Sequence, residues 1–365
     1  MSLLIHLAQV PDFRQPGGNL RHALLDILVI SVLAVLSGAD DFVEMATFAE
    51  RKLPVLRRHL ALENGPPSHD TFRRVFQHLD AARFNAAFLG WVRQLLPAAV
   101  AEQVCVDGKT LRGSGPRPLH LVSALARAEG LCLAQVAGAG KGHELAALPD
   151  VLALLDLSGG ALVSLDALGC QPEVAAQIVE QGGDYLLALK HNQRGLRAEA
   201  ERALTAVPAG HEAWGWAAGN VPVRWQVAVQ TDLRWVDEAG RWPKLAALVR
   251  VETLRCPPTG EPQAQPVRYY LSSRPALPAA QALEAVRGHW AIENQLHWHL
   301  DVTLAEDAHR LRDRQAVENV ALVRKMALNL LRADPEPGSL KVKRKRLAWD
   351  DTYLDRLLTQ LAECV

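Results

Sequence analysis

The chain has 365 residues, of which 49% are hydrophobic and 22% charged, and its 40 Lys and Arg residues balance its 40 Asp and Glu residues. This length and composition are those of an ordinary soluble globular protein, for which two or three domains are expected. A neutral chain gives no bulk support for a nucleic-acid partner, so any contact with DNA has to come from local basic patches.

Nothing in the sequence indicates a membrane span or export. The apolar run from Leu24 to Gly38 is too short to cross a hydrocarbon core of about 30 Å and contains Asp26, so it predicts a buried helix. The N-terminus shows no basic region followed by an apolar stretch and a cleavage site, so a cytoplasmic location is expected. The five cysteines form no CxxC pair, which argues against a disulfide framework and against a zinc ribbon.

The first part of the chain is predicted to be helical. From Leu20 to Val100 the apolar residues recur with helical spacing, in segments such as LLDILVISVLAVLSG and HDTFRRVFQHL. We therefore predict an all-helical N-terminal domain over residues 1–98 that binds DNA or a second protomer. Arg73 and Arg74, near the polar start of HDTFRRVF, are its candidate phosphate contacts. The alternative is a capped helix whose apolar side chains enter the core.

From Gln103 the pattern changes to that of an α/β sheet. The segments VCVDG, HLVSALAR and LCLAQVAGAG predict three antiparallel strands, and ALVSLDALG and DYLLALK predict two more that alternate with helices. Ribonuclease-H-like nucleases use this order, although another α/β enzyme fits the pattern nearly as well. We predict a catalytic domain over residues 99–332 with a β-rich insertion at about 192–278. A Pro-containing basic tail is expected over 333–365, after the last ordered helix.

Three acidic residues form the candidate site. Asp107 follows the apolar segment VCV and Asp166 follows ALVSL, so both are expected at strand ends. A carboxylate there is costly unless it is paired or bound to a cation, although each Asp could instead cap a turn or a helix. Glu293 shares one face of a late helix with His289 and His297, at spacings of four residues.

Three interpretations of this constellation remain open. Carboxylate oxygens are the ligands that Mg²⁺ or Mn²⁺ prefers, and two such ions can activate water and stabilise charge on a phosphodiester. His289, Glu293 and His297 could instead bind zinc. The third alternative is a half-buried helix whose tryptophans, Trp290 and Trp298, pack against the protein.

Several stretches together resemble the insertion-sequence transposases of the ISAs type, the H-repeat-associated proteins. These stretches are RHALLDIL, PPSHDTFRRVF, VDGKTLRGS, HLVSA, LVSLDALGCQ, GGDYLLALKHNQ, YYLSS and RGHWAIENQLHWHLDVTLAEDAHR. The resemblance covers most of the chain. It implies a ribonuclease-H-like fold and a dependence on Mg²⁺, with Asp107, Asp166 and Glu293 as catalytic metal ligands. The stretch AGNVPVR departs from the family pattern and keeps only its Gly219 and Arg224.

The resemblance further implies that the partner is double-stranded DNA, both element ends and target, bound by a homodimer or higher oligomer. Polar and basic residues expected to flank the acidic centre are the predicted DNA contacts: Lys109, Arg112, Lys190, Asn192, Gln193, Arg287, His289 and His297. Alternatively, the basic ones merely balance the three acids. The altered AGNVPVR stretch favours a second function, that of a transposase-derived DNA-binding protein without transposition activity.

Overall fold

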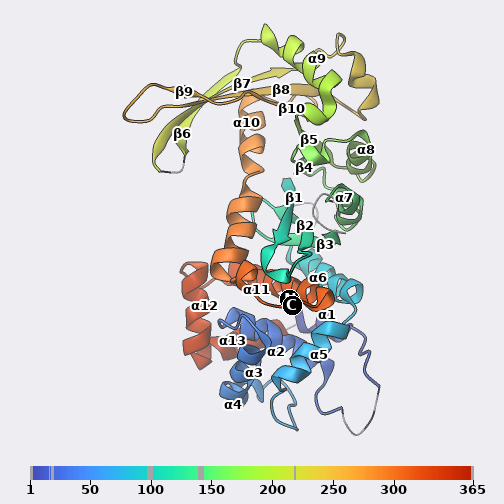
Figure 1. Ribbon diagram of the computed structural model, residues 1–365, viewed down its shortest axis with the longest axis vertical. Helices are drawn as coiled ribbons and strands as arrows, with labels where there is room; N and C mark the ends of the chain where they lie inside the picture. Colours follow the sequence, from blue (N-terminus) through green and yellow to red (C-terminus); the bar gives the residue numbers. More distant parts are fainter. Residues whose placement is uncertain are drawn as a thin grey trace.

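The computed structural model describes residues 3–15, 17, 20–96, 102–138, 144–217 and 219–362. The molecule is elongated, with three regions along its long axis (Figure 1). Helices from both ends of the chain form one end, the first five strands lie in the middle, and the later strands form the other end.

The N-terminal region is all-helical among its described residues, as the apolar spacing predicts. Its helices are α1 Leu3–Ala8, α2 Leu24–Leu36, α3 Phe42–Arg51, α4 Leu53–Leu56, α5 His69–His78 and α6 Ala81–Leu95. The side chains of Asp41, Ser68 and Asp80 accept backbone N–H groups at the starts of α3, α5 and α6. Helix α2 is buried nearly all round, including Asp26. In the part of the chain that the structure describes, no helix is long and apolar enough to cross a membrane.

The C-terminal helices pack against this N-terminal region. They are α11 Arg314–Ala333, α12 Leu340–Trp349 and α13 Asp351–Ala362, and they share one hydrophobic cluster with α1 to α6. The ordered chain therefore continues beyond the helix at which the sequence pattern predicts it to end. The basic segment packs through apolar side chains such as Leu347 and Leu354, and the buried Lys343 is satisfied because its Nζ donates to the carbonyl of Leu331 at 3.0 Å.

A mixed ten-stranded sheet confirms the α/β prediction. The strand order is β3-β2-β1-β4-β5-β10-β8-β7-β6, and β9 pairs with β8. Strands β1, β2 and β3 form an antiparallel meander, whereas β4 is parallel to both β1 and β5. The strands of this part are β1 Gln103–Leu111, β2 Leu119–Ala126, β3 Cys132–Gly138, β4 Leu162–Leu165 and β5 Asp184–Leu189. Helices α7 Glu144–Ala153 and α8 Pro172–Glu180 connect β3 to β4 and β4 to β5.

The β-rich segment extends the same sheet. After α9 Arg194–Thr205, its strands are β6 His211–Ala217, β7 Val221–Gln230, β8 Ala247–Arg255, β9 Gln263–Ala264 and β10 Arg268–Ser272. The last of these, β10, pairs antiparallel with β5 and joins the segment to the middle of the molecule. The hydrophobic pattern misses β6, because every second side chain of this edge strand is exposed, including Trp214 and Trp216.

A long helical column then returns along the molecule from the β-rich end (Figure 1). It consists of α10 Ala279–Gly288 followed by two π-helical segments, Ile292–His297 and His299–Thr303. Single-turn π segments are rare and frequently occur at functional sites, because the wider turn re-aims the side chains on it. This column carries Glu293 toward the strands of the middle region.

Candidate metal centre

Asp107 lies on β1 at the point where β1 leaves its neighbour β4. The structure corrects the expectation that its strand ends there, because β1 continues to Leu111 and Asp107 pairs with Ser123 of β2. The parallel pairing with β4 does end one residue earlier, at Val106 and Leu165. Asp107 is therefore paired with β2 on one side, while on the side of β4 it has no strand partner and a ligand can approach.

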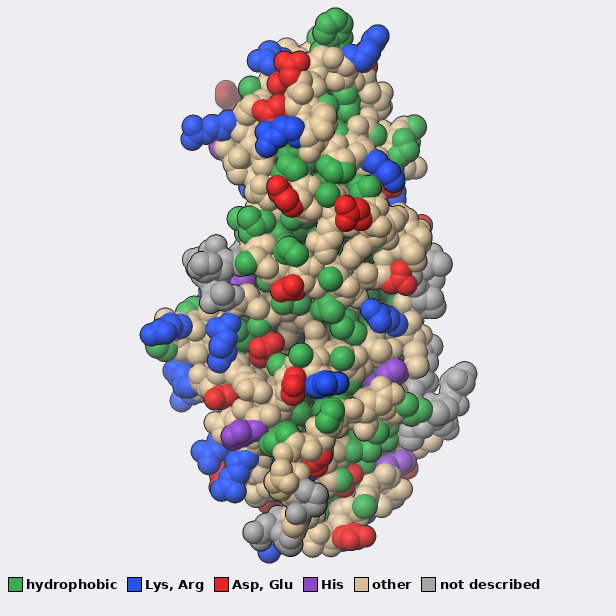
Figure 2. Space-filling view, turned by 90° about the vertical axis from the view of Figure 1, so that its right-hand side faces the viewer, with side chains coloured by type: hydrophobic (Ala, Val, Ile, Leu, Met, Phe, Trp, Pro, Cys, Tyr) green, Lys and Arg blue, Asp and Glu red, His purple; other side chains and the backbone are tan. Residues whose placement is uncertain are grey.

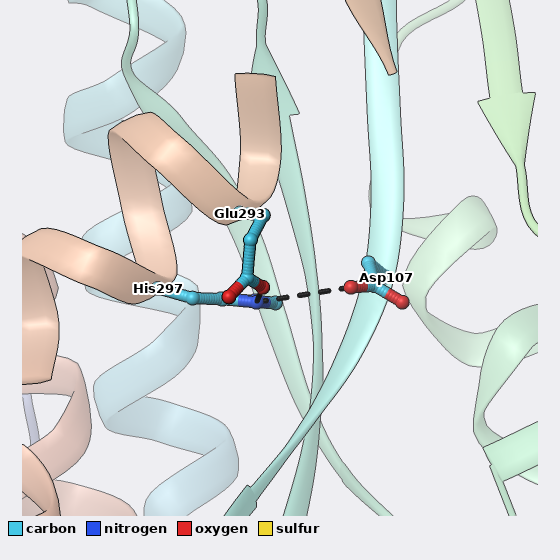
Figure 3. Close-up of side chains that lie close together, drawn as sticks. All are labelled: Asp107, Glu293 and His297. Atoms are coloured by element: carbon cyan, nitrogen blue, oxygen red, sulfur yellow. Dashed lines mark hydrogen bonds and ion pairs between the residues drawn. The ribbon is translucent and has the colours of Figure 1, made fainter. Parts of the chain in front are cut away.

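Glu293 and His297 approach Asp107 from the π-helical segment. The Nδ1 atom of His297 lies 3.2 Å from Glu293 Oε2 and 3.7 Å from Asp107 Oδ2 (Figure 3). One donor atom from each of the three side chains can be chosen so that all lie within 4.8 Å of one another. His297 is buried, whereas the side chain of Glu293 is 58% exposed. The site is thus open on the Glu293 side and closed behind the imidazole.

The electrostatics of the three groups favour a cation. Burial raises the pKa of Asp107 to about 6, with His297 and the backbone N–H of Gly108 acting in the opposite direction. The hydrogen bond from His297 is the main cause that lowers the pKa of Glu293. The Nε2 atom of His297 is buried without a hydrogen-bond partner among the described residues. Two carboxylates and an imidazole in this arrangement fit a divalent ion, which would relieve the cost of burying Asp107.

Asp166 lies directly after β4, at the strand end where the sequence predicts it. Its Oδ1 atom accepts the backbone N–H of Leu168 at 2.9 Å and of Gly169 at 3.5 Å, which caps the short 3₁₀ helix Ala167–Gly169. The side chain is exposed and is not part of the close group of three. Val106 and Leu165 are paired in the parallel register of β1 and β4, so Asp107 and Asp166 each come one residue after that pair.

Lys109 is engaged inside the protein. Its Nζ atom pairs with Asp301 and, at 2.8 Å, with the fully buried Glu306, and its side chain is only 10% exposed. The turn after β1 also packs closely against the segment that carries Glu306, since a Cβ atom added to Gly113 would lie 2.3 Å from the carbonyl oxygen of His309. Lys109 thus balances internal charge, but its ion-pair partners are Asp301, Glu306 and Asp307 rather than the three candidate acids.

Three other predicted DNA contacts make hydrogen bonds around β4 and the turn that follows it. Asn192 Nδ2 donates to the carbonyl of Ala167 at 2.7 Å, and Gln193 Nε2 donates to that of Cys170 at 3.0 Å. His289 Nδ1 lies 3.2 Å from the hydroxyl of Ser164, and burial lowers the pKa of His289. In this conformation these groups support the Asp166 turn and the strand before it.

The remaining predicted basic contacts are exposed to different degrees. Lys190 is exposed and has no ion pair among the described residues, and the side chain of Arg112 is 87% exposed. The guanidinium of Arg287 lies 4.1 Å from the ring centre of Trp225. Arg73 pairs with Asp70 at 2.6 Å, while Arg74 lines a cavity of about 550 Å³ on the N-terminal helices. Acidic and basic side chains are interspersed on the face in Figure 2, so charge there marks no single DNA path.

The sequence patterns missed the acidic partners of Lys109. Asp301, Glu306 and Asp307 all lie within 4.0 Å of its Nζ atom. The signal was present, because the stretch DVTLAEDAHR is rich in acids and follows the helix of Glu293 directly. Only the tertiary structure pairs that stretch with a lysine near the start of the domain.

The described part of the altered AGNVPVR stretch, residues 219–224, lies at the β6–β7 hairpin. Gly219 and Asn220, which lie between the paired residues Ala217 and Val221, both have positive φ, +78° and +55°, a region that glycine and asparagine adopt more readily than other residues. Arg224 lies on β7, 3.8 Å from Glu212 and 5.9 Å from the ring centre of Trp214. In this chain residues 219–224 therefore contribute to the hairpin turn and to the pairing of β6 with β7.

Comparison with known proteins assigns the chain to a family. The family described as "Transposase DDE domain" matches residues 99–330, and the one described as "DDE_Tnp_1-associated" matches residues 4–92. "Putative transposase YncI" of Escherichia coli O157:H7 is 35% identical over 375 residues, covering 99% of this chain and 95% of that protein. "H repeat-associated putative transposase YhhI" of E. coli K12 is 32% identical over 371 residues, covering 98% and 97%.

The chain belongs to the DDE transposase family. These two relatives extend over nearly its whole length, and one is named an H repeat-associated putative transposase, which confirms the resemblance noted in the sequence. A solved structure of the piggyBac transposase synaptic complex with hairpin DNA covers 99% of this chain and 78% of that one. Its TM-score of 0.44 at 12% identity is too low to support an argument about fold or ligand.

Proposed function

We propose that this chain catalyses metal-dependent DNA strand cleavage and strand transfer of an insertion sequence. Asp107, Asp166 and Glu293 hold two Mg²⁺ or Mn²⁺ ions in this proposal. The observation that carries it is the approach of Asp107 on β1 to Glu293 on the π-helical segment, within one group of donor atoms (Figure 3). Carboxylates brought together from distant parts of a chain are costly unless a cation or a bound proton compensates them.

The sheet supports a ribonuclease-H-like description of the catalytic part. The order β3-β2-β1-β4-β5, with an antiparallel meander and parallel β4 and β5, is the order that the sequence pattern suggests for such nucleases. Asp107 and Asp166 then lie on the neighbouring strands β1 and β4. We place this domain over residues 99–332, with its insertion at 192–278. The N-terminal helical domain over 1–98 shares a hydrophobic core with its last helix, α11, and with α12 and α13.

The side chains around the acids orient them. Divalent ions, when bound, would activate water and neutralise charge on the attacked phosphate and on the leaving oxygen. Backbone pairing with Ser123 fixes Asp107, and the hydrogen bond from His297 fixes the carboxylate of Glu293. Asn192 anchors the turn that carries Asp166. These contacts hold the ligands before DNA arrives, which reduces the cost of assembling the centre.

A second candidate function is hydrolysis with zinc. It is favoured by one observation, that the close group contains an imidazole, His297, while Asp166 lies outside it. Zinc prefers nitrogen and carboxylate ligands in such mixed sets. His289, the other histidine of that interpretation, contacts Ser164 instead. Metal analysis of the purified protein separates the two, because tightly bound zinc supports the hydrolase and its absence supports the transposase.

A cleavage assay tests the proposed function. The protein is incubated with a labelled duplex that carries the ends of its own element, with Mg²⁺ or Mn²⁺ and, in parallel, with chelator. Cleavage that requires the metal supports the enzyme. Binding of the duplex without cleavage in any metal supports the DNA-binding protein instead. Sedimentation of the same mixtures tests the proposed homodimer or higher oligomer on DNA.

A further inference from the structure

Exposed apolar side chains continue from Glu293 along the helical column. The backbone N–H of Trp298 bonds to the carbonyl of Glu293, so one π-helical turn separates the two residues. Val302 follows four residues later on the same face. Trp298 is 50% and Val302 60% exposed, against the expectation that the tryptophans of this helix pack inward. The ring of His299 meets that of Trp298 edge-on at 4.8 Å, which restrains the exposed indole.

A hollow of about 360 Å³ lies where this face meets α12. Val302 forms part of one wall, and Trp349, which is 74% exposed, forms part of another. The cationic side chains among the lining residues are Lys341, Arg344 and Lys345, and none of the described lining residues is acidic. Lys345 Nζ lies 5.7 Å from the ring centre of Trp349. We call Trp298, Val302 and Trp349 the aromatic strip.

The helix that carries Trp349 is held rigidly. Arg344 donates to the carbonyls of Val35 and Thr303 and pairs with Asp40 at 2.8 Å, which fixes α12 to the end of the π-helical column. Lys341 and Lys345 are exposed and have no ion pair among the described residues. Their charges are therefore free to meet a ligand, while the surface beneath them is already formed.

We propose that the aromatic strip binds an unpaired strand of DNA that leads away from Glu293. Bases would stack on Trp298 and Trp349, and phosphates would lie near Lys341 and Lys345. Tryptophan rings interleaved with cations on a preformed surface are the combination that binds single strands without sequence preference. The inference rests on the proposed function, because only a DNA substrate brings a strand past Glu293.

A second copy of the chain fits this surface less well. In a two-fold contact the same patch lies on both copies, so Lys341 and Lys345 would face their own symmetry mates. Like charges at such short range oppose association. Phosphates supply the opposite charge, and bases supply flat apolar faces for the two indoles.

Binding is measured on the intact, metal-free protein by anisotropy of a fluorescein-labelled oligodeoxythymidine. We expect Trp349→Ala to weaken binding on the order of ten-fold, because one stacking platform is lost. Trp349→Phe should retain most of the affinity. The double variant Lys341→Ala and Lys345→Ala should reduce the salt slope of binding by about 1.4. Trp235→Ala is the control, since Trp235 is 82% exposed between β7 and β8, away from α12.

Unchanged affinity in Trp349→Ala and an unchanged slope in the lysine variant would overturn the inference. If Trp349→Ala instead alters the sedimentation of the free protein and leaves DNA binding intact, the strip is an interface between copies. Failure of the proposed function has a different signature, because the parent would then leave element ends uncut in Mg²⁺ or Mn²⁺. A parent that cuts element ends but does not bind the oligonucleotide would overturn the inference alone. Because Trp349 is exposed, replacing it should not unfold the protein. Circular dichroism of each variant checks that the fold is retained.

Discussion

At the residue scale, Glu306 carries a buried negative charge that depends on three cationic partners. It is fully buried, and Lys109 and the buried Lys325 and Arg324 provide the opposing charges. Burial alone would raise its pKa, but these three cations lower the pKa to about 2. The pairing ties β1 to the segment after the π-helical column and to α11, so it fixes the frame around Asp107.

We expect Glu306→Gln to destabilise the protein by about 3–5 kcal/mol. The reason is that removing one partner of a buried charge cluster leaves the other charges uncompensated. Urea unfolding measures the change. Glu284→Gln is the matched control, because Glu284 is exposed in its pair with Arg127 and should cost at most about 1 kcal/mol. Equal midpoints for the two variants would contradict this account of the cluster.

The same group sets a stability change at acid pH. The pKa of Glu306 is about 2 in the folded protein, below its ordinary value of 4.5, so the folded state binds the proton less readily than the unfolded state. Its contribution is therefore complete above pH 4.5 and is lost as the pH falls toward 2, by on the order of 3 kcal/mol. Urea midpoints of the parent and of Glu306→Gln at pH 7, 4 and 3 should converge as the pH falls. A constant difference between them would refute the assignment.

Salt dependence separates exposed from internal lysines. Lys190→Ala should lower the magnitude of the salt slope of duplex binding by about 1, because an exposed phosphate contact is lost. Lys109→Ala should leave the slope unchanged and lower the stability instead, since its charge is used by Asp301 and Glu306. The measurement is duplex affinity across a salt series. A reduced salt slope in Lys109→Ala would show that Lys109 contacts DNA.

At the element scale, the turn after β1 locks onto the segment after the π-helical column. Gly113 is required there by close approach, since a Cβ atom would lie 2.3 Å from the carbonyl oxygen of His309 and 2.7 Å from that of Asp307. Both contacts are to backbone, which cannot rotate away. We expect Gly113→Ala to destabilise the protein by about 1–3 kcal/mol. Gly219→Ala tests a different constraint, its positive φ in open space, and should cost less.

Helices and strands with a regular spacing of apolar residues could be predicted from the sequence. Features that depend on contacts with other segments could not. The strands of Asp107 and Asp166 follow from the apolar segments before them. The length of β1 does not, because its second half is stabilised by pairing with β2 and by Lys109 rather than by apolar residues. The π-helical turns could not be predicted from a spacing of four residues. Glu293 and His297 share one face in an α-helix and in a π-helix alike.

At the scale of the whole molecule, the two ends of the chain form one body. Asn319 of α11 donates to the carbonyls of Phe76 and Leu79, and Arg324 donates to that of Asp40. No local pattern indicates these contacts between distant segments. They mean that deleting residues 1–98 would expose the core shared with α11 to α13, so a truncation cannot isolate a DNA-binding role.

Point substitutions test the N-terminal region instead. Arg74 is exposed on a cavity whose basic side chains include Arg14 and Arg21, and Arg73 is partly neutralised by Asp70. If this region contacts DNA, Arg74→Ala should weaken duplex binding and reduce the salt slope by about 1, with a smaller effect for Arg73→Ala. Duplex titration measures both. Unchanged binding in the two variants would leave α5 as a capped core helix.

The most direct test of the account is cleavage of labelled element ends by Asp107→Asn, Asp166→Asn and Glu293→Gln in Mn²⁺. An amide keeps the shape of the side chain and removes the charge that holds a metal ion, so each variant should bind DNA and fail to cut it. Glu284→Gln, on the same helical column, should cut like the parent. Cleavage at the parent rate by any of the three variants would show that its residue is not a metal ligand and would contradict the proposed centre.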